Sequence, residues 1–198
     1  MTNVTEVPEE DVLRAHYYRF LARMLAKPAD RAALDDAARL EGDETELGRA
    51  LNALAREAAK TTPEAADDEF HALFIGLGRG ELVPFASYYL TGFLNEKPLA
   101  RLRHDMDRIG ITRAEEVHEP EDQIASLCEM MAGLIMGEFD QPVDFAGQAA
   151  FYAVHVQPWA KQFFEDLESA KGASLYRPVG TLGRLFMSIE DAAFQMAG

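Results

Sequence analysis

The chain is 198 residues long, with 48% hydrophobic and 27% charged residues, a balance typical of a globular protein rather than a disordered one. This length predicts one domain over residues 1–198, with a loose lead-in at residues 1–8. The chain carries 34 acidic and 19 basic residues and a formal net charge of −15, which repels nucleic acid and anionic membranes and excludes both as partners. The charge attracts cationic partners, although an acidic surface kept for solubility is the simpler explanation.

Cysteine usage and the N-terminus indicate where the protein resides. Cys128 is the single cysteine, so no internal disulfide can form and nothing indicates secretion. The segment from Met1 to Asp11 is polar and acidic, without the basic and apolar regions of a leader peptide. No stretch approaches the ~20 apolar residues that a membrane span requires. We therefore predict a cytoplasmic protein with no stable membrane insertion.

Apolar residues recur at helical spacing through the first half of the chain. Lys27-Pro28 ends the first helix, and Asp30 is placed to cap the second. Thr61 and Glu64 have the spacing of a capping box, and Pro63 suits the first turn of the helix that follows. The helices predicted in this half cover residues 12–25, 30–40, 44–60 and 61–74.

The second half begins with breaker-rich loops at residues 76–84 and 92–98, on either side of a short aromatic segment from Ser87 to Leu90. Gly110 is placed to end one helix, and Pro158 either kinks another or starts a new one. The helices predicted here cover residues 99–109, 119–137 and 143–170, with one or two more in 179–197. Because no run of period two predicts a strand, the fold class is all-α, a single-domain bundle of about eight to ten helices.

Residues 119–137 are predicted to form the central helix of this bundle. Pro120 suits the first turn of that helix, and an acidic cluster suits the positive end of its dipole. The cluster comprises Glu119, Glu121 and Asp122, and the apolar, inward face comprises Ile124, Leu127, Cys128, Met131 and Ile135. Gly133 and Gly137 on the opposite face predict close packing, because glycine inside a helix is otherwise unfavourable. Acids at a helix start are favourable by themselves, so a ligand role for the cluster stays one of two interpretations.

Two motifs contain suitable side chains but lack the context that their chemistry requires. Residues 76–80 are rich in glycine, but they lack the Gly-Lys-Ser/Thr ending of a phosphate-binding loop, and no strand precedes them. Residues 104–107 include a histidine and two aspartates, which point in different directions on a helix. We therefore expect a flexible loop at the first motif and a solvated helix face, rather than a metal site, at the second.

No nucleophile motif accompanies His71, His118 or His155. His155 follows Tyr152 by three residues and precedes Trp159 by four, which is same-face helical spacing. This spacing predicts an oriented histidine in the core or in a groove rather than a base. The residues thus predict no catalytic group and no metal site.

Four stretches, taken in order, resemble the TorD/DmsD/NarJ family of redox-enzyme maturation chaperones. The likeness covers roughly residues 10–190, and the ordered set is more specific than any one stretch. The stretches are Asp68-Glu69-Phe70-His71-Ala72-Leu73-Phe74-Ile75-Gly76, Glu81-Leu82-Val83-Pro84-Phe85-Ala86-Ser87-Tyr88-Tyr89-Leu90, Glu119-Pro120-Glu121-Asp122-Gln123, and Phe151-Tyr152 through His155 to Pro158-Trp159.

The resemblance implies an all-helical protein without catalytic activity or a cofactor of its own. Members of this family bind the twin-arginine signal peptide and the apo-form of a molybdenum or tungsten oxidoreductase, and they hold back its export until the cofactor is inserted. A formate dehydrogenase is one possible client. The peptide-binding residues that the resemblance implies are Glu119, Asp122, Gln123, Phe85, Ser87, Tyr88, Tyr89 and Trp159.

Within this set, the roles follow from side-chain chemistry. Glu119 and Asp122 match the family's acids and are suited to accept guanidinium groups. The aromatic surface near Phe85, Tyr88 and Tyr89 is expected to hold the apolar part of the peptide. Histidine is usual in the family where this chain has Gln123, which cannot titrate near neutrality.

Two other functions stay open at this point. One is an acidic helical adaptor for a folded partner, with no peptide groove. The other is a metal-dependent hydrolase that uses the acidic cluster, against which the absence of converging ligands counts. The sequence also leaves open whether the protein is a monomer or a domain-swapped dimer.

Overall fold

The computed structural model of the chain describes residues 7–76, 80–113, 119–140 and 142–196. These residues form ten α-helices and a short π-helical turn, and no strand occurs among them, so the predicted all-α class is confirmed. The helices are α1 (Glu9–Ala26), α2 (Arg31–Ala38), α3 (Glu46–Lys60), α4 (Pro63–Phe70), the π-helical turn η1 (His71–Ile75), α5 (Ala86–Thr91), α6 (Lys97–Ile109), α7 (Ile124–Met136), α8 (Phe145–His155), α9 (Ala160–Ser169) and α10 (Tyr176–Met196).

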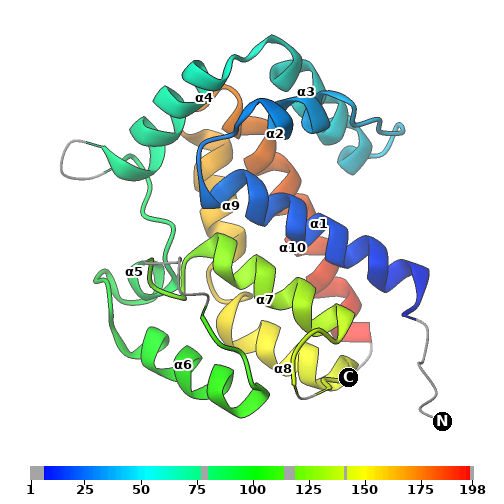
Figure 1. Cartoon of the computed structure of the whole chain (residues 1–198), viewed down its shortest axis with the longest axis vertical. Helices are drawn as coiled ribbons and strands as arrows, with labels where there is room; N and C mark the ends of the chain where they lie inside the picture. The colour runs from blue at the N-terminus through cyan, green and yellow to red at the C-terminus, as the bar shows by residue number, and fades with distance from the viewer. Residues whose placement is uncertain (1–6, 77–79, 114–118, 141, 197–198) are drawn as a thin grey trace.

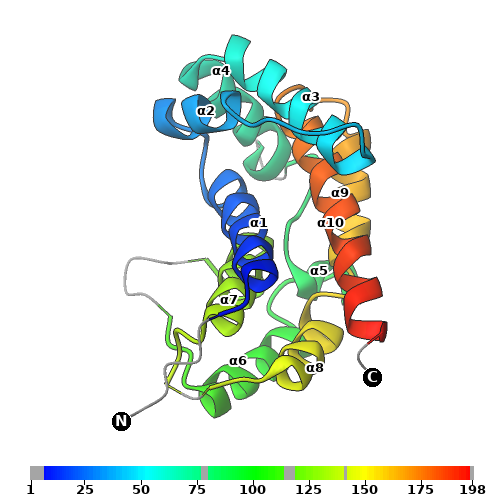
Figure 2. The same ribbon diagram turned by 90° about the vertical axis from the view of Figure 1, so that its right-hand side faces the viewer.

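Two helix pairs run through the middle of the molecule (Figures 1 and 2). α1 lies along α7, and α10 lies along α9. α2, α3 and α4 form one end of the molecule, where α3 packs on α2 and α10. α6 and α8 form the other end, below α1 and α7, and α5 lies at about the height of α7. No helix among the described residues is both long enough and apolar enough to span a membrane.

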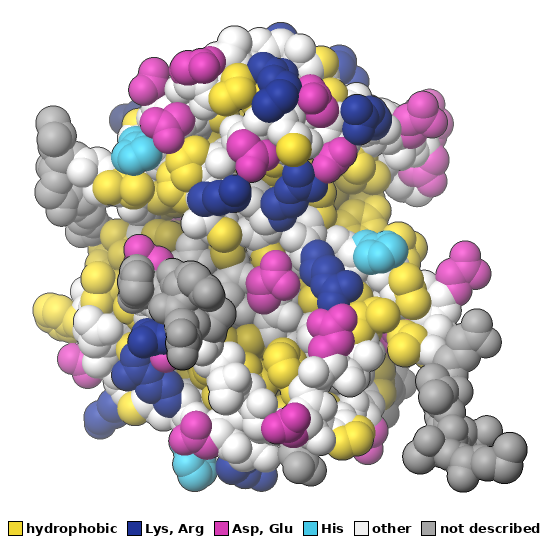
Figure 3. Space-filling model, viewed as in Figure 1, with side chains coloured by type: hydrophobic (Ala, Val, Ile, Leu, Met, Phe, Trp, Pro, Cys, Tyr) yellow, Lys and Arg dark blue, Asp and Glu magenta, His cyan; other side chains and the backbone are white. Residues whose placement is uncertain are grey.

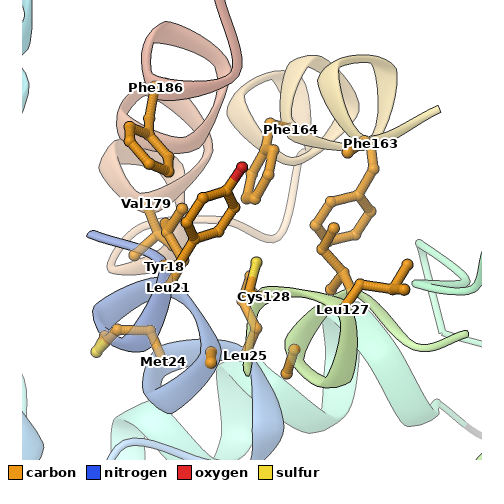
Figure 4. Close-up of a cluster of buried hydrophobic side chains, with 14 of the residues drawn as sticks. Tyr18, Leu21, Met24, Leu25, Leu127, Cys128, Phe163, Phe164, Val179 and Phe186 are labelled. Carbon is orange, nitrogen blue, oxygen red and sulfur yellow. The ribbon is translucent and has the colours of Figure 1, made fainter. Parts of the chain in front are cut away.

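The core lies where the two central pairs meet (Figure 4). Aromatic rings from α9 and α10 pack there against aliphatic side chains from α1 and α7. Tyr18 lies edge-on to Phe186, with ring centroids 4.8 Å apart. The buried members of this cluster include Tyr18, Leu21, Met24, Leu25, Leu127, Cys128, Phe163, Phe164, Val179 and Phe186.

Two predicted helix boundaries, at Asp30 and Gly110, are confirmed by the local structure. Asp30 caps α2 by accepting a hydrogen bond from the amide of Ala33 at 2.9 Å, and Gly110 ends α6 with a φ of +81°. Thr62, rather than Thr61, caps α4, because its hydroxyl accepts from the amide of Ala65. At Pro158 the chain restarts, since α8 ends at His155 and α9 begins at Ala160.

The start of the central helix was predicted wrongly. α7 begins at Ile124, and Pro120 lies in a turn before it, not in its first helical turn. Gln123 takes the capping position, because its side-chain oxygen accepts hydrogen bonds from the amides of Ala125 at 2.5 Å and Ser126 at 3.3 Å. The three acids therefore lie in the segment that leads into the helix.

The body of α7 is buried on nearly every side. Leu127 and Met131 have no exposed surface, as predicted, and within the helix only Glu129 is classed as exposed. Gly133 provides the predicted close contact, since a β-carbon there would lie 2.5 Å from the ring of Phe139. Gly137 is different, because it has a φ of +65° and ends the helix instead of packing within it.

Candidate functional site

The start of α5 is tied to the segment that leads into α7. The amide of Ala86 donates to the carbonyl of Asp122 at 2.9 Å, and the amide of Ile124 donates to the carbonyl of Pro84 at the same distance. Phe85 and Gln123 form an isolated antiparallel bridge between the two segments. These contacts place residues that are about 35 positions apart in the sequence on one small, rigid platform.

Asp122 is the buried acid of this platform, with 1% of its surface exposed. Its Oδ2 accepts hydrogen bonds from the amide of Ser87 at 2.7 Å and from the Ser87 hydroxyl. Its Oδ1 is buried and has no hydrogen-bond partner among the described residues. The only other such atom in the described side chains is an amide oxygen, Oε1 of Gln148. Because buried polar atoms are nearly always paired, this oxygen of Asp122 is a candidate acceptor for a donor beyond the described residues.

A cavity of about 320 Å³ lies over Asp122, between α5, α6 and the end of α8. Its wall is mainly apolar, with two basic side chains, Lys97 and Arg101, and one histidine. Lys97 and Arg101 are exposed at the rim. The residues that line the cavity are Ala86, Leu90, Thr91, Lys97, Pro98, Arg101, Leu102, Asp122, Leu127, Val154 and His155.

The other two acids of the cluster have different surroundings. Glu121 is 8% exposed and is bound by Arg103, whose guanidinium nitrogens lie 2.8 and 2.9 Å from Oε2, while Arg113 lies 3.7 Å from Oε1. Burial raises the pKa of Glu121, but the bonds from Arg103 outweigh burial and hold the pKa below its usual value. Glu119 is exposed. Of the three acids, only Asp122 combines burial with an unpaired oxygen.

The predicted aromatic residues face away from the Asp122 cavity. The ring of Tyr89 lies 5.3 Å from that of Trp159, and its hydroxyl donates to Asp166 on α9 at 2.9 Å. Trp159 is only 2% exposed, and its indole nitrogen donates to the carbonyl of His155 at 2.9 Å. None of Phe85, Tyr88, Tyr89 and Trp159 lines the cavity, to which α5 contributes Ala86, Leu90 and Thr91. The structure therefore brings Ser87 to Asp122, while Tyr89 packs against Trp159 and α9.

Gln123 is used by the fold itself. Besides capping α7, its side-chain nitrogen donates to the carbonyl of Leu25, at the end of α1, at 3.2 Å. Both ends of the amide therefore have partners within the chain, and the residue joins two central helices.

A buried histidine–aspartate pair is the feature that sequence reasoning missed. Nε2 of His155 lies 2.9 Å from Oδ2 of Asp105, whereas residues 104–107 were expected to form a solvated face. The buried, oriented state of His155 is as predicted, at 6% exposed. Burial lowers the pKa of His155, and the bond to Asp105 opposes that shift only in part. The spacing of His155 from Tyr152 and Trp159 indicated its orientation, but no local signal indicates a partner 50 residues away.

Two acids in the stretches that carry the family resemblance are structural. Glu69 accepts hydrogen bonds from three successive amides, at 2.7 to 3.1 Å, where α10 begins. Glu81 accepts from the amides of Lys171 and Gly172 at 2.7 and 3.0 Å. These carboxylates fix the loop before α10, and their oxygens are already occupied by hydrogen bonds from backbone amides.

The remaining candidate motifs offer no site in the described residues. No group of three or more His, Cys, Asp or Glu side chains that could hold a metal occurs in the part of the chain that the structure describes. The middle of the glycine-rich segment (residues 77–79) and His118 lie outside that part. On the face shown in Figure 3, acidic and basic side chains are interspersed, so the net charge of −15 does not form a single acidic patch there.

Known proteins of similar sequence and fold identify the family of this chain. The sequence profile of the nitrate reductase delta subunit family matches residues 40–165. The chaperone protein TorD of Vibrio cholerae is 28% identical over 189 residues, covering 92% of this chain and 82% of its own length, and TorD of Vibrio vulnificus is 25% identical over 171 residues, covering 76% and 80%. A redox enzyme maturation protein from Archaeoglobus fulgidus, described as putative in its crystal structure, has the same fold, with a TM-score of 0.59 at 19% identity over 95% of this chain and 99% of its own. The chain therefore belongs to the nitrate reductase delta subunit family, which includes the redox-enzyme maturation chaperones that its sequence resembles.

Proposed function

We propose that this protein is a cytoplasmic chaperone that binds the twin-arginine signal peptide of a molybdenum or tungsten oxidoreductase and keeps the apo-enzyme from export until its cofactor is inserted. The protein does this by binding alone, without catalysis. The observation that carries the proposal is the buried Oδ1 of Asp122, which lacks a partner within the described chain and belongs to a residue that lines a cavity.

The energetics of Asp122 favour a cationic donor. A buried carboxylate oxygen without a hydrogen bond destabilises the folded protein by about 1–3 kcal/mol, or more because it is charged. An arginine guanidinium presents several N–H groups in a planar fork that matches a carboxylate, so binding would satisfy this oxygen. Ser87 already holds Oδ2, which fixes the orientation of the acceptor before the peptide arrives.

Lys97 and Arg101 at the rim weaken the attraction for a cationic peptide. Both side chains are exposed and long, so they can turn into solvent when a ligand enters. We expect Arg101→Gln to tighten binding of an arginine-containing peptide and to leave a neutral peptide unaffected.

The test is calorimetric titration with a peptide that contains the arginine pair and an apolar run. We expect a dissociation constant near the micromolar range, which corresponds to about −8 kcal/mol. Affinity should fall as salt rises, because salt screens charges over ~10 Å at 0.1 M, while an apolar contribution should persist. Replacing both arginines of the peptide by glutamine should weaken binding strongly. In the protein, Glu129→Gln removes an exposed charge from α7 and is the charge-matched control for Asp122→Asn. No binding by either peptide would reject the proposal and favour an adaptor for a folded partner.

The client and the oligomeric state are separate parts of the proposal. A formate dehydrogenase is one candidate client, and titration with leaders from several molybdoenzymes would rank the candidates. Light scattering on the purified protein would distinguish a monomer from a domain-swapped dimer.

A further inference from the structure

A second and larger cavity, of about 1110 Å³, is lined by residues of α6, α8 and the segment before α8. Both helices lie below α1 and α7 in Figure 2. Apolar side chains from α7, α8, the segment before α8 and residues 7–8 make up most of its lining, whereas α6 contributes Ile109 and three charged side chains. Ile135 and Phe151 are buried at its floor, and Ile109, Val143, Phe145 and Val154 are half-buried around them. This groove is an apolar surface that a partner can reach from solvent, and such surfaces mark binding sites.

The groove adjoins the Asp122 cavity. Arg101 and Val154 line both. His155 lines the Asp122 cavity and Asp105 lines the groove, and these two side chains are joined by a 2.9 Å contact. One ligand can therefore occupy both spaces without crossing a solvent-exposed helix.

The charges around the groove are largely neutralised within the chain. Arg108 pairs with Asp105 at 3.2 Å, and Asp11 pairs with Arg14 at 2.6 Å. Asp144 is used to cap α8, where it accepts from the amide of Gly147 at 2.8 Å. The groove therefore offers mainly apolar contact, in contrast to the unpaired carboxylate oxygen of the neighbouring cavity.

We infer that the groove between α6 and α8 holds the apolar segment of the same peptide whose arginine occupies the Asp122 cavity. This inference rests on the proposed function and changes the expected apolar site, which sequence reasoning placed at Phe85, Tyr88 and Tyr89. The stretch of α8 from Val154 to Phe145 spans about 14 Å, since a helix rises 1.5 Å per residue. About four extended residues cover that distance, so the apolar run must begin within a few residues of the arginine pair.

The position of the bound peptide can be mapped by photo-cross-linking. The probe is a synthetic peptide with two arginines and a run of about ten leucines and alanines, the length of a leader's apolar region, in which one leucine near the arginines is replaced by benzoylphenylalanine. We expect cross-links to α6 and α8. Cross-links confined to residues 85–94 would overturn the inference while leaving the proposed function intact.

Matched variants on α8 test the same point by affinity. Ala150 is exposed and lines the groove, whereas Ala153 is exposed on the same helix and does not line it. Ala150→Glu should weaken binding of the apolar peptide roughly tenfold, because it places a charge against the peptide's apolar side chains. Ala153→Glu should leave that affinity unchanged. Neither variant should change binding of a peptide whose apolar run is replaced by serine. Circular dichroism would confirm that both variants fold.

The possible outcomes separate the two hypotheses. If Ala150→Glu and Ala153→Glu bind the apolar peptide as tightly as the unaltered protein, the groove is not the apolar site and the inference fails. If replacing the two arginines by glutamine leaves affinity unchanged, the proposed function fails even when the groove is occupied. Self-association that is lost in Ala150→Glu would assign the groove to a second copy of the chain and overturn the inference.

Discussion

Glu190 and Asp122 are both buried acids, but their surroundings differ. Glu190 has no exposed surface and is held by Arg14, which donates to its two oxygens at 2.7 and 2.9 Å, and by the hydroxyl of Tyr18 at 3.0 Å. The Asp122 side chain is 1% exposed, and within the described residues it has Ser87 as its single partner and keeps one oxygen unpaired. The saturated acid joins α1 to α10, whereas the unsaturated acid faces a cavity. Burial alone does not distinguish a structural acid from a ligand-binding one, but hydrogen-bond saturation does.

The largest expected effect is on stability at the saturated acid. Glu190→Gln keeps the shape of the side chain but removes the buried counter-charge of Arg14, which retains its pair with the more exposed Asp11. Removing one partner of a buried ion pair typically lowers the free energy of unfolding by about 3–5 kcal/mol. Denaturant titration measures this loss, and a loss below about 1 kcal/mol would show that the Arg14–Glu190 pair is not needed for stability.

A similar loss is expected in the apolar core beside Asp122. Leu127 is fully buried on α7, and Leu127→Ala should lower the free energy of unfolding by about 2–5 kcal/mol, depending on how far its neighbours relax. The same titration measures it. A change typical of a surface position, within about 0.5 kcal/mol, would mean that the orientation of α7 is wrong.

The buried His155–Asp105 pair predicts a smaller, pH-dependent effect. Burial lowers the pKa of His155 in the folded protein, so the unfolded chain takes up a proton first as the pH falls below about 6.5. The contribution of His155 to the free energy of unfolding should therefore decrease as the pH falls from 7 to 5 and stay constant above pH 7. Asp105 does not contribute over this range, because its bonds to His155 and Arg108 outweigh burial and keep its pKa low.

Urea titrations at pH 7, 6 and 5 on the unaltered protein and on His155→Gln measure the contribution of His155 as the difference between the two proteins. The variant should lose the His155 contribution to the slope. Equal slopes in the two proteins would contradict the assignment.

The smallest effect on stability is expected at the unsaturated acid. Asp122→Asn retains an oxygen for the two Ser87 bonds and removes a buried charge, so the free energy of unfolding should change by less than about 1 kcal/mol in either direction. Denaturant titrations of Asp122→Asn and Glu190→Gln under the same conditions compare the two acids directly. A loss as large as that of Glu190→Gln would make Asp122 a structural acid as well.

Sequence reasoning predicted the fold well, because helix periodicity and breaker residues are local signals. It misplaced the start of α7, because a proline followed by acids suits a turn as well as a first helical turn, and the cap depends on the side-chain bonds of Gln123. Asp122 was identified through the family resemblance, but its contact with Ser87, 35 residues away, has no signature in the local pattern. Trp159 was predicted to bind the peptide, but it is buried against Tyr89. This burial depends on how α5 packs on α9, which no local pattern predicts.

The central claim is that the free oxygen of Asp122 accepts an arginine from the bound peptide, and a double-mutant cycle tests it most directly. Affinities are measured for the unaltered protein and for Asp122→Asn, each with the twin-arginine peptide and with its glutamine-substituted form. We expect Asp122→Asn to weaken the arginine peptide by about 1–3 kcal/mol and to affect the glutamine peptide much less, which gives a coupling energy of similar size. Equal losses for the two peptides would contradict the claim and show that the arginines are recognised elsewhere.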